Sequence, residues 1–242
     1  MILIAIGNTH TQIAHTEDGR DFRVERRPSG AAIAELLAGL PSPWSSWLAE
    51  EPIYLGGVVP EREALWRAGL ASGQIRDWDP ERFHALLPNA YEPPQSLGFD
   101  RRCCLLAAAR DWPDRNLLVV DAGTAITLDL LAGGRFHGGR ILPGLGLSLR
   151  ALAQHTAQLP TLCPQSCDMD FGNSTQECLL LGVTAGAAAA VDAALRDGRR
   201  RYPDLGLLLT GGDAPLLQAR LGQGELVPNL LLRGFFLLTS VT

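Results

Sequence analysis

The first stretch that could do chemistry is ILIAIGNTHTQIA (2–14), where a polar turn at Gly7-Asn8-Thr9 separates two apolar runs. Glycine lets the backbone approach a phosphate and aim its N–H groups at it, and the Asn and Thr side chains add donors. Similar turns follow apolar runs at Gly123-Thr124 and at Thr210-Gly211-Gly212. Each could be a plain hairpin turn, but three together favour a site for nucleotide phosphates.

Two carboxylates lie where phosphate chemistry could use them. Asp121 stands at a strand end beside the second turn, where a carboxylate typically binds a cation that neutralises phosphate charge. Asp100 follows Gly98 and falls in the first turn of a predicted helix, with Arg101 beside it to keep it ionised. The alternative for Asp100 is a carboxylate that only stabilises the helix N-terminus. The first turn has no such acid, because Ala5 occupies the position that corresponds to Asp121.

The amino-acid composition excludes or disfavours several classes of protein. The 242 residues are 46% hydrophobic and 19% charged, which favours a packed globular chain, and the net charge of −5 disfavours nucleic-acid binding. All 21 basic residues are arginine, which excludes a Schiff-base lysine and the G-x-x-x-x-G-K-[ST] phosphate loop. Five cysteines without a C-x-x-C pair favour reduced thiols in the cytoplasm. The N-terminal run is interrupted too early for a signal peptide or a membrane span.

The elements that must position these residues alternate between strands and helices. Apolar runs predict strands at 2–6, 11–16, 52–60, 117–122 and 205–210, with a hairpin turn at Gly133-Gly134. Helical spacing predicts helices over 31–40, 61–70, 100–112 and 173–200, the last opened by a capping box of Ser174 and Glu177. Residues 76–97 are expected to be irregular, and 226–238 to form a last strand and helix.

An internal repeat sets the expected domain organisation. The order strand, x-x-Gly turn, strand occurs around Gly7 and again around Gly123. Such a repeat indicates two halves of one topology. We therefore expect an α/β protein with halves at 1–112 and 113–242.

Four motifs carry a family resemblance. They are the first turn, NAYEPPQSLGFDRR (89–102), DAGTA (121–125) and GGRILPG (138–144). In this order they resemble the motifs D-x-G-N-T, Y-x-x-P-x-x-L-G-x-D-R, D-x-G-T-A and G-G-x-I-x-P-G of type III pantothenate kinases. The second motif is matched without gaps by Tyr91, Pro94, Leu97, Gly98, Asp100 and Arg101. The likeness spans nearly the whole chain, and Thr175, seven residues before Gly182, fits a further family pattern.

The resemblance implies a fold, a reaction and a set of site residues. The fold would be two duplicated actin-like (ribonuclease H-like) α/β domains with a nucleotide cleft between them. The reaction would be ATP-dependent phosphorylation of pantothenate, the first step towards coenzyme A. Asp100 would be the general base and Asp121 would bind a monovalent cation, K⁺ or NH₄⁺. Pantothenate would be held by Tyr91, Gly98, Phe99, Asp100, Arg101 and Thr175, and ATP with Mg²⁺ by Ala5, Ile6, Gly7, Asn8, Thr9, His10, Thr11, Gln12 and Thr124.

The chain departs from the family pattern at two positions of the first hairpin. The family has aspartate where this chain has Ala5, and several members have a basic residue where it has Gln12. The first change removes a ligand of the metal or its water, and the second removes a phosphate contact. The interpretation is therefore a pantothenate kinase, with two alternatives: a catalytically weakened paralogue that acts as a regulatory or assembly partner, or a kinase or phosphatase of the same fold with another small substrate.

The resemblance and the composition also imply how the protein assembles and where it acts. The helix predicted over 173–197 has a long apolar face lined by glycine and alanine, so another helix can approach it closely. We expect a cytoplasmic homodimer across this helix, without nucleic-acid or membrane partners.

Overall fold

The computed structural model describes residues 1–242 except 72, 90, 94–95, 168 and 240–242, so Pro94 of the second motif lies outside the described residues. The chain forms two compact units. The first comprises Met1–Leu87, Glu92–Arg110 and the chain from Asn229 onward, and the second comprises Pro88–Tyr91 and Asp111–Pro228. This division differs from the expected one at 112/113 mainly in the last helix, which belongs to the first unit.

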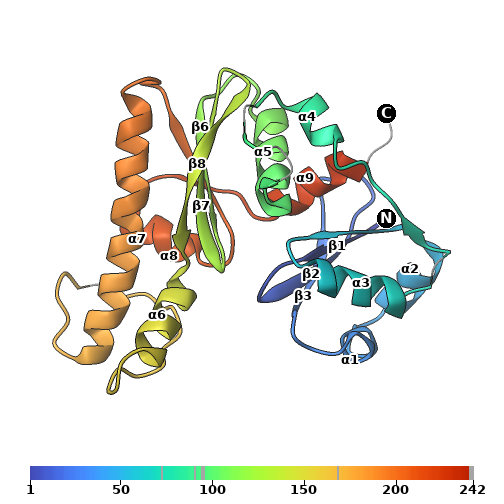
Figure 1. The fold of residues 1–242 in the computed structure, drawn as a ribbon, viewed down its shortest axis with the longest axis horizontal. Coiled ribbons are helices and arrows are strands. Elements are labelled where there is room, and N and C mark those ends of the chain that lie inside the picture. Colours follow the sequence, from blue (N-terminus) through green and yellow to red (C-terminus); the bar gives the residue numbers. More distant parts are fainter. Residues whose placement is uncertain (72, 90, 94–95, 168, 240–242) are drawn as a thin grey trace. The chain divides into compact units, whose positions relative to one another are not determined.

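The first unit is built on a five-stranded sheet of order β3-β2-β1-β4-β5 (Figure 1). Strand β1 pairs antiparallel with β2 and parallel with β4. The strands are β1 (Ile2–Ile6), β2 (His10–His15), β3 (Arg23–Pro28), β4 (Ile53–Gly57) and β5 (Ile75–Arg76). The helices are α1 (Ile33–Ala38), α2 (Trp44–Glu50), α3 (Pro60–Gly69), α4 (Arg82–Leu86), α5 (Phe99–Asp111) and α9 (Leu230–Thr239).

The alternation of side chains along β1 divides the packing between two faces. Ile2, Ile4 and Ile6 point to one face, where they join a core with Trp44 and Trp66 from the helices α2 and α3. Ala5 therefore points to the other face, together with Gly56, its direct neighbour on β4. A Cβ placed on Gly56 would lie 2.5 Å from the ring of Phe99, which shows that α5 covers this face.

The return of α9 to the first unit has a physical cause in close packing. A Cβ placed on Gly234 would lie 1.7 Å from the carbonyl oxygen of Cys103, so only glycine permits this approach of α9 to α5. The neighbouring Phe235 is fully buried, and its ring meets that of Phe99 edge to face at 4.8 Å between centroids. These contacts join the end of the chain to its first half.

The second unit repeats the strand order of the first. Its sheet has the order β10-β9-β6-β7-β8, with β6 antiparallel to β7 and parallel to β9. The strands are β6 (Leu117–Ala122), β7 (Ala125–Ala132), β8 (Arg135–Pro143), β9 (Gly206–Thr210) and β10 (Glu225–Leu226), and the helices are α6 (Leu145–Gln154), α7 (Thr175–Arg199) and α8 (Ala214–Leu221). The two sheets, each built on the same hairpin, confirm the expected class of duplicated actin-like α/β domains.

Several local expectations are confirmed and others were incomplete. Gly133 and Gly134 both have positive φ (56° and 67°), as the two-residue turn between β7 and β8 requires. The expected helices over 100–112 and 173–200 are α5 and α7. The segment 76–97 was wrongly expected to be irregular throughout, because it contains α4. Sequence reasoning also missed α2, α6 and β3, whose charged sequence RVERRP forms an exposed edge strand.

Helix α7 stands out by its apolar length. Among the described residues it is the one helix long and apolar enough to cross a membrane, and 33% of that apolar window is buried in the structure. Its buried side, Val191, Ala194 and Leu195, packs in the core of the second unit with Leu118 and Val120 of β6. A core helix of a globular protein passes the same test of length and composition.

Candidate functional site

The first turn connects β1 to β2 and is closed by a backbone hydrogen bond. The N–H of Gly7 donates to the carbonyl oxygen of His10 at 3.1 Å. A Cβ placed on Gly7 would lie 2.8 Å from that oxygen, so the turn requires glycine. Asn8, Thr9 and His10 are exposed, which leaves this end of the sheet accessible to a ligand.

Ser29, just after β3, holds this turn from the neighbouring strand. Its N–H donates to the carbonyl of Thr9 at 2.9 Å, and its hydroxyl donates to the carbonyl of Gly7 at 2.7 Å. Because that hydroxyl has one proton, the Thr11 hydroxyl, 3.0 Å away, is the donor in the bond between the two side chains. Ser29 is only 5% exposed, so these bonds are sheltered from water. No pattern in the sequence indicates this role.

Asp100 lies in the first turn of α5, half-buried, as the sequence predicted. Its Oδ1 accepts the N–H of Arg101 at 2.8 Å. The same oxygen would be 2.6 Å from a Cβ placed on Gly98, so the carboxylate occupies the space that this glycine leaves open. Burial raises the pKa of the Cys103 thiol well above its usual value, and the nearby negative charge of Asp100 adds to that shift.

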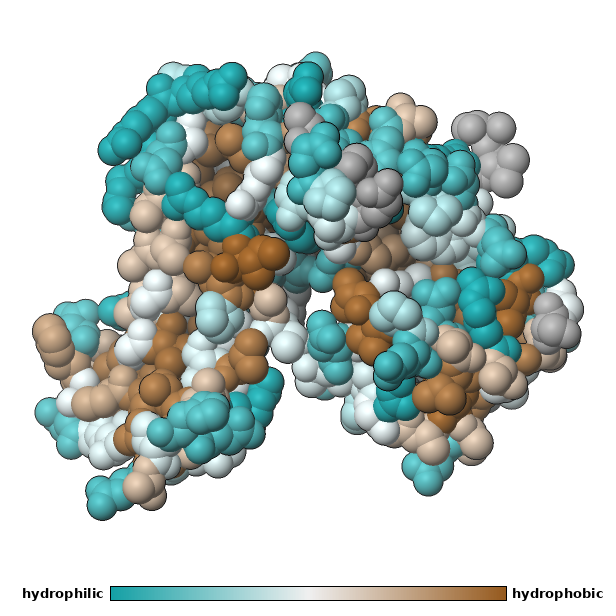
Figure 2. All heavy atoms as spheres, viewed as in Figure 1, coloured by the Kyte–Doolittle hydropathy of each residue, from teal (hydrophilic) through white to brown (hydrophobic). Residues whose placement is uncertain are grey.

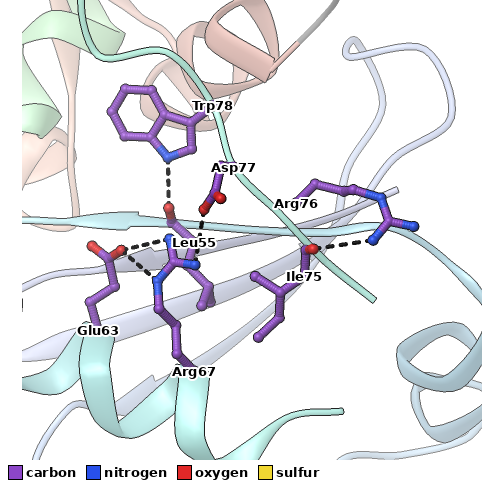
Figure 3. Close-up of polar contacts among 7 residues, drawn as sticks. All are labelled: Leu55, Glu63, Arg67, Ile75, Arg76, Asp77 and Trp78. Atoms are coloured by element: carbon purple, nitrogen blue, oxygen red, sulfur yellow. Dashed lines mark hydrogen bonds and ion pairs between the residues drawn. The ribbon is translucent and has the colours of Figure 1, made fainter. Parts of the chain in front are cut away.

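Two side chains fix the segment that carries Asp100. Arg102, 8% exposed, donates from Nε to the carbonyl of Leu97 at 2.8 Å and from Nη1 to the carbonyl of Pro80 at 3.3 Å. Trp78 donates from its indole to the carbonyl of Leu55 at 2.7 Å (Figure 3), and its ring contacts Phe99 at 5.4 Å between centroids. Position 78 belongs to the stretch expected to be irregular, yet it supports the start of α5.

The chain next to Trp78 is itself held from α3. Arg67 donates to Glu63 through Nε and Nη2, at 3.2 and 3.1 Å, and to Asp77 through Nη1 at 3.1 Å (Figure 3). Because Asp77 is 89% exposed at its side chain, this link is worth little as an ion pair in water. The bond from the Trp78 indole to Leu55 is the sheltered contact of this segment with β4.

The second turn connects β6 to β7 in the second unit. The N–H of Gly123 donates to the carbonyl of Ala125 at 3.0 Å, and the N–H of Gly144 donates to the carbonyl of Thr124 at 3.0 Å. A Cβ placed on Gly144 would lie 2.1 Å from the carbonyl oxygen of Gly123. The last glycine of the GGRILPG motif, Gly144, therefore packs directly against the second turn.

Asp121 lies beside this turn with oxygen-bearing neighbours on both sides. It pairs with Thr127 on β7 and with Thr210 on β9, so the three side chains share one face. A Cβ placed on Gly211 would lie 2.4 Å from Oδ1 of Asp121, so the third glycine turn approaches this carboxylate closely. Carboxylate and hydroxyl oxygens are the donors that hard cations prefer. Within the described residues no group of three or more His, Cys, Asp or Glu could hold a metal ion.

The two remaining predicted residues also lie in the second unit. The ring of Tyr91 stacks on that of Phe136, with centroids 5.8 Å apart and planes 26° apart, and its N–H donates to Oδ1 of Asn89 at 3.3 Å. Thr175 is the exposed first residue of α7. The predicted capping bond is present, since the N–H of Glu177 donates to Oγ of Ser174 at 3.2 Å.

The predicted site residues are therefore divided between the units. The first unit brings together the turn residues Ala5–Gln12 and the motif Gly98–Arg101, because Phe99 covers Gly56 beside Ala5. The second unit brings Asp121 and Thr124 to one turn and also contains Tyr91 and Thr175.

Comparison with known proteins gives one consistent family. The family model of type III pantothenate kinase matches residues 1–197. The type III pantothenate kinase of Synechococcus elongatus is 37% identical over 245 residues, covering 96% of this chain and 94% of that protein. The one from Bacteroides fragilis (strain YCH46) is 38% identical over 133 residues, and that match spans 55% of the relative's length.

Solved structures share the fold at low identity. A conserved Baf family protein from Campylobacter jejuni has a TM-score of 0.65 and 22% identity, covering 98% of this chain and 96% of that one. A ROK family glucokinase from Streptomyces griseus, solved with glucose and AMPPNP, has a TM-score of 0.50 and 9% identity, with 97% of each chain covered. At these identities the likeness concerns the fold alone.

Replacing Ser29 tests how the first turn is held. We expect Ser29→Ala to lower the free energy of unfolding by about 1–2 kcal/mol, because it removes two sheltered hydrogen bonds. The amide of Gly7 should also exchange its hydrogen faster. Ser46→Ala is the matched control, since the Ser46 hydroxyl bonds to Pro43 in an exposed position. Denaturant unfolding and hydrogen exchange measure both effects, and unchanged exchange at Gly7 would show that the turn is held without Ser29.

Proposed function

Because this chain belongs to the type III pantothenate kinase family, we propose that it transfers the γ-phosphoryl group of ATP to the primary hydroxyl of pantothenate. The product is 4'-phosphopantothenate, and the reaction is the first step towards coenzyme A. The observation that carries the proposal is the geometry at Gly98–Arg101. There a half-buried carboxylate is anchored at a helix N-terminus over a glycine that leaves room for it.

Asp100 is the general base of the proposed reaction. Its Oδ1 is engaged by the Arg101 N–H, so Oδ2 is the oxygen that accepts the proton of the substrate hydroxyl. As the hydroxyl oxygen bonds to the γ-phosphorus, the bond from that phosphorus to the β,γ-bridging oxygen breaks and ADP leaves. Phosphoryl transfer depends mostly on positioning and charge neutralisation, which fits a site whose base is rigidly held. Gly98, Phe99, Arg101, Tyr91 and Thr175 are proposed to bind pantothenate.

The two hairpin turns are proposed to bind ATP, through Ala5–Gln12 in the first unit and Thr124 in the second. Asn8 and Thr9 are exposed, so their backbone N–H groups can donate to phosphate oxygens. The glycine in each turn has no side chain and lets a phosphate approach the backbone closely. ATP would enter with Mg²⁺. Asp121 with its threonine neighbours fits a contact to a hard cation, and we assign it the monovalent ion, K⁺ or NH₄⁺, that would supply positive charge near the phosphates.

The first unit fits a metal ion less well. Ala5 contributes no oxygen, and its neighbours in the sheet are Gln12 and Gly56. This observation favours the second candidate function, a weakened paralogue that binds the ligands and acts as a regulatory or assembly partner. Magnesium retains several waters and often takes only one or two carboxylates, so Ala5 does not by itself exclude catalysis.

A homodimer across α7 is part of the proposal. A Cβ placed on Gly182 or Gly186 would meet no atom within 4 Å, so this thin face is uncovered by the unit's own described residues. Figure 2 shows apolar surface at the α6 and α7 end of the second unit, where Leu147 is 40% and Phe171 89% exposed. Such exposed apolar surface is typical of an interface. The free thiols suit a reducing compartment such as the cytoplasm. The net charge of −5 disfavours a nucleic-acid partner, and no membrane partner is part of the proposal.

Asp100→Asn tests the base. The amide oxygen can still accept the Arg101 N–H, so the fold should persist, while pantothenate-dependent ADP release should fall about 10²-fold or more. Asp111→Asn, at the other end of α5, is the matched control and should keep the parent rate. If Asp100→Asn turns over like the parent, Asp100 serves only the helix terminus.

Gly186→Leu tests the dimer. A leucine on the thin face should block close approach of a second helix, so sedimentation should detect a monomer. Gly73→Leu is the control, since Gly73 also has open space around its Cβ position but lies in the first unit. A Gly186→Leu protein that sediments as the parent does would place the interface elsewhere.

Ala5→Asp tests the missing acid. A carboxylate two residues before the first phosphate turn should lower the magnesium concentration for half-maximal ADP release and raise the plateau, because charge neutralisation matters most as the γ-phosphoryl group leaves. Ala5→Asn, which adds the same volume without charge, is the control. The measurement is a magnesium titration at fixed ATP, pantothenate and potassium. Equal midpoints and plateaus would mean that the acid is dispensable, and no turnover in any of the proteins would favour the regulatory partner.

A further inference from the structure

Arg26 lies in line with Ala5 across the first sheet. Ala5 pairs directly with Gln12 on β2, and Gln12 pairs directly with Arg26 on β3. Directly paired residues point to the same face of a sheet, so the three side chains form one row. On this same face of the sheet, the ring of Phe99 covers Gly56. The core formed by Ile2, Ile4 and Ile6 lies on the opposite face.

The guanidinium of Arg26 lies next to His10, the residue whose carbonyl closes the first turn. Its Nη2 lies 3.3 Å from Nδ1 of His10, whose carbonyl accepts the N–H of Gly7. Because arginine only donates, Nδ1 is the acceptor and this nitrogen of His10 carries no proton. Partial burial and the charge of Arg26 lower the pKa of His10, which keeps that imidazole neutral at physiological pH. The positive charge beside the turn therefore resides on Arg26.

That charge is uncompensated in the part of the chain that the structure describes. Arg27, the next residue, forms an ion pair with Glu25 at 2.7 Å on the opposite face of β3. None of the ion pairs among the described residues includes Arg26, whose side chain is exposed. The other two positions of the row, Ala5 and Gln12, are uncharged. An exposed guanidinium without a carboxylate, next to a glycine turn, is suited to bind an anion through two parallel N–H bonds.

We propose that Arg26 binds the polyphosphate of ATP at the first turn. This inference rests on the proposed function, in which the Gly7–Thr9 turn holds the phosphates. Strands lie about 4.8 Å apart, so the Cα of Arg26 is about 10 Å from that of Ala5, and the long arginine side chain spans much of that distance. In a chain without lysine, the third strand thus supplies the phosphate-binding cation of the first unit.

The test compares Arg26→Gln with Arg27→Gln. Each variant removes one positive charge from the same edge strand, but only Arg26 faces the row of Ala5. Calorimetric titration without pantothenate measures the affinity of each protein for magnesium-ATP and for adenosine, which lacks phosphate. We expect Arg26→Gln to bind ATP about tenfold more weakly and adenosine unchanged, since a charge-assisted bond to phosphate is lost. Arg27→Gln should stay within about twofold for both ligands, and Arg26→Lys should recover part of the loss.

Three outcomes separate the inference from the proposed function. If the parent binds neither ATP nor adenosine, the proposed nucleotide site itself is wrong, and the role of Arg26 is wrong with it. If the parent binds ATP and Arg26→Gln binds it equally well, Arg26 is no phosphate ligand. If Arg26→Gln weakens adenosine as much as ATP, the lost contact is not to the phosphates, and the inference is again overturned.

Discussion

The edge-to-face contact between Phe99 and Phe235, over the bare backbone of Gly56, is the interaction on which the first unit depends. An aromatic pair of this kind contributes about 0.5–1.5 kcal/mol beyond the area that it buries. It fixes α5 and α9 on the sheet and places Asp100 one residue from a ring that touches β4 beside Ala5. A side chain at Gly56 would displace that ring. The candidate base and the first turn therefore share one unit because a glycine admits an aromatic ring.

The β1–β2 and β6–β7 hairpins have the same topology, but their side chains are suited to different chemistry. The first closes with the Gly7 N–H on the carbonyl of His10 and the second with the Gly123 N–H on the carbonyl of Ala125, so the first turn is one residue longer. At the same place in the register the first sheet has Ala5 between Gln12 and Gly56, whereas the second has Asp121 between two threonines. The shared strand pairing thus carries a row suited to direct hydrogen-bond donors in the first sheet and a row suited to a cation in the second.

The sequence predicted those parts of the fold that depend on local signals. The glycine turns, the helix that begins before Asp100 and the capping box at Ser174 each follow from a few adjacent residues. The charged strand β3 was missed, because an edge strand carries no apolar alternation, and with it Ser29 and Arg26 were missed as neighbours of the first turn. The return of α9 depends on the contact of Gly234 with Cys103, which joins distant parts of the chain. Such contacts leave no pattern in neighbouring residues.

The absence of an acid at position 5 and the presence of Arg26 are separate electrostatic features. Two unit charges about 10 Å apart in water interact by only about 0.4 kcal/mol, so an aspartate at position 5 would hardly neutralise an arginine two strands away. An acid there would act on phosphate through a metal ion, whereas Arg26 would act on it by direct hydrogen bonds. The guanidinium therefore cannot substitute for the acid in holding magnesium. It can only contribute to holding the nucleotide, which is why affinity for ATP and affinity for metal should respond to different residues of this row.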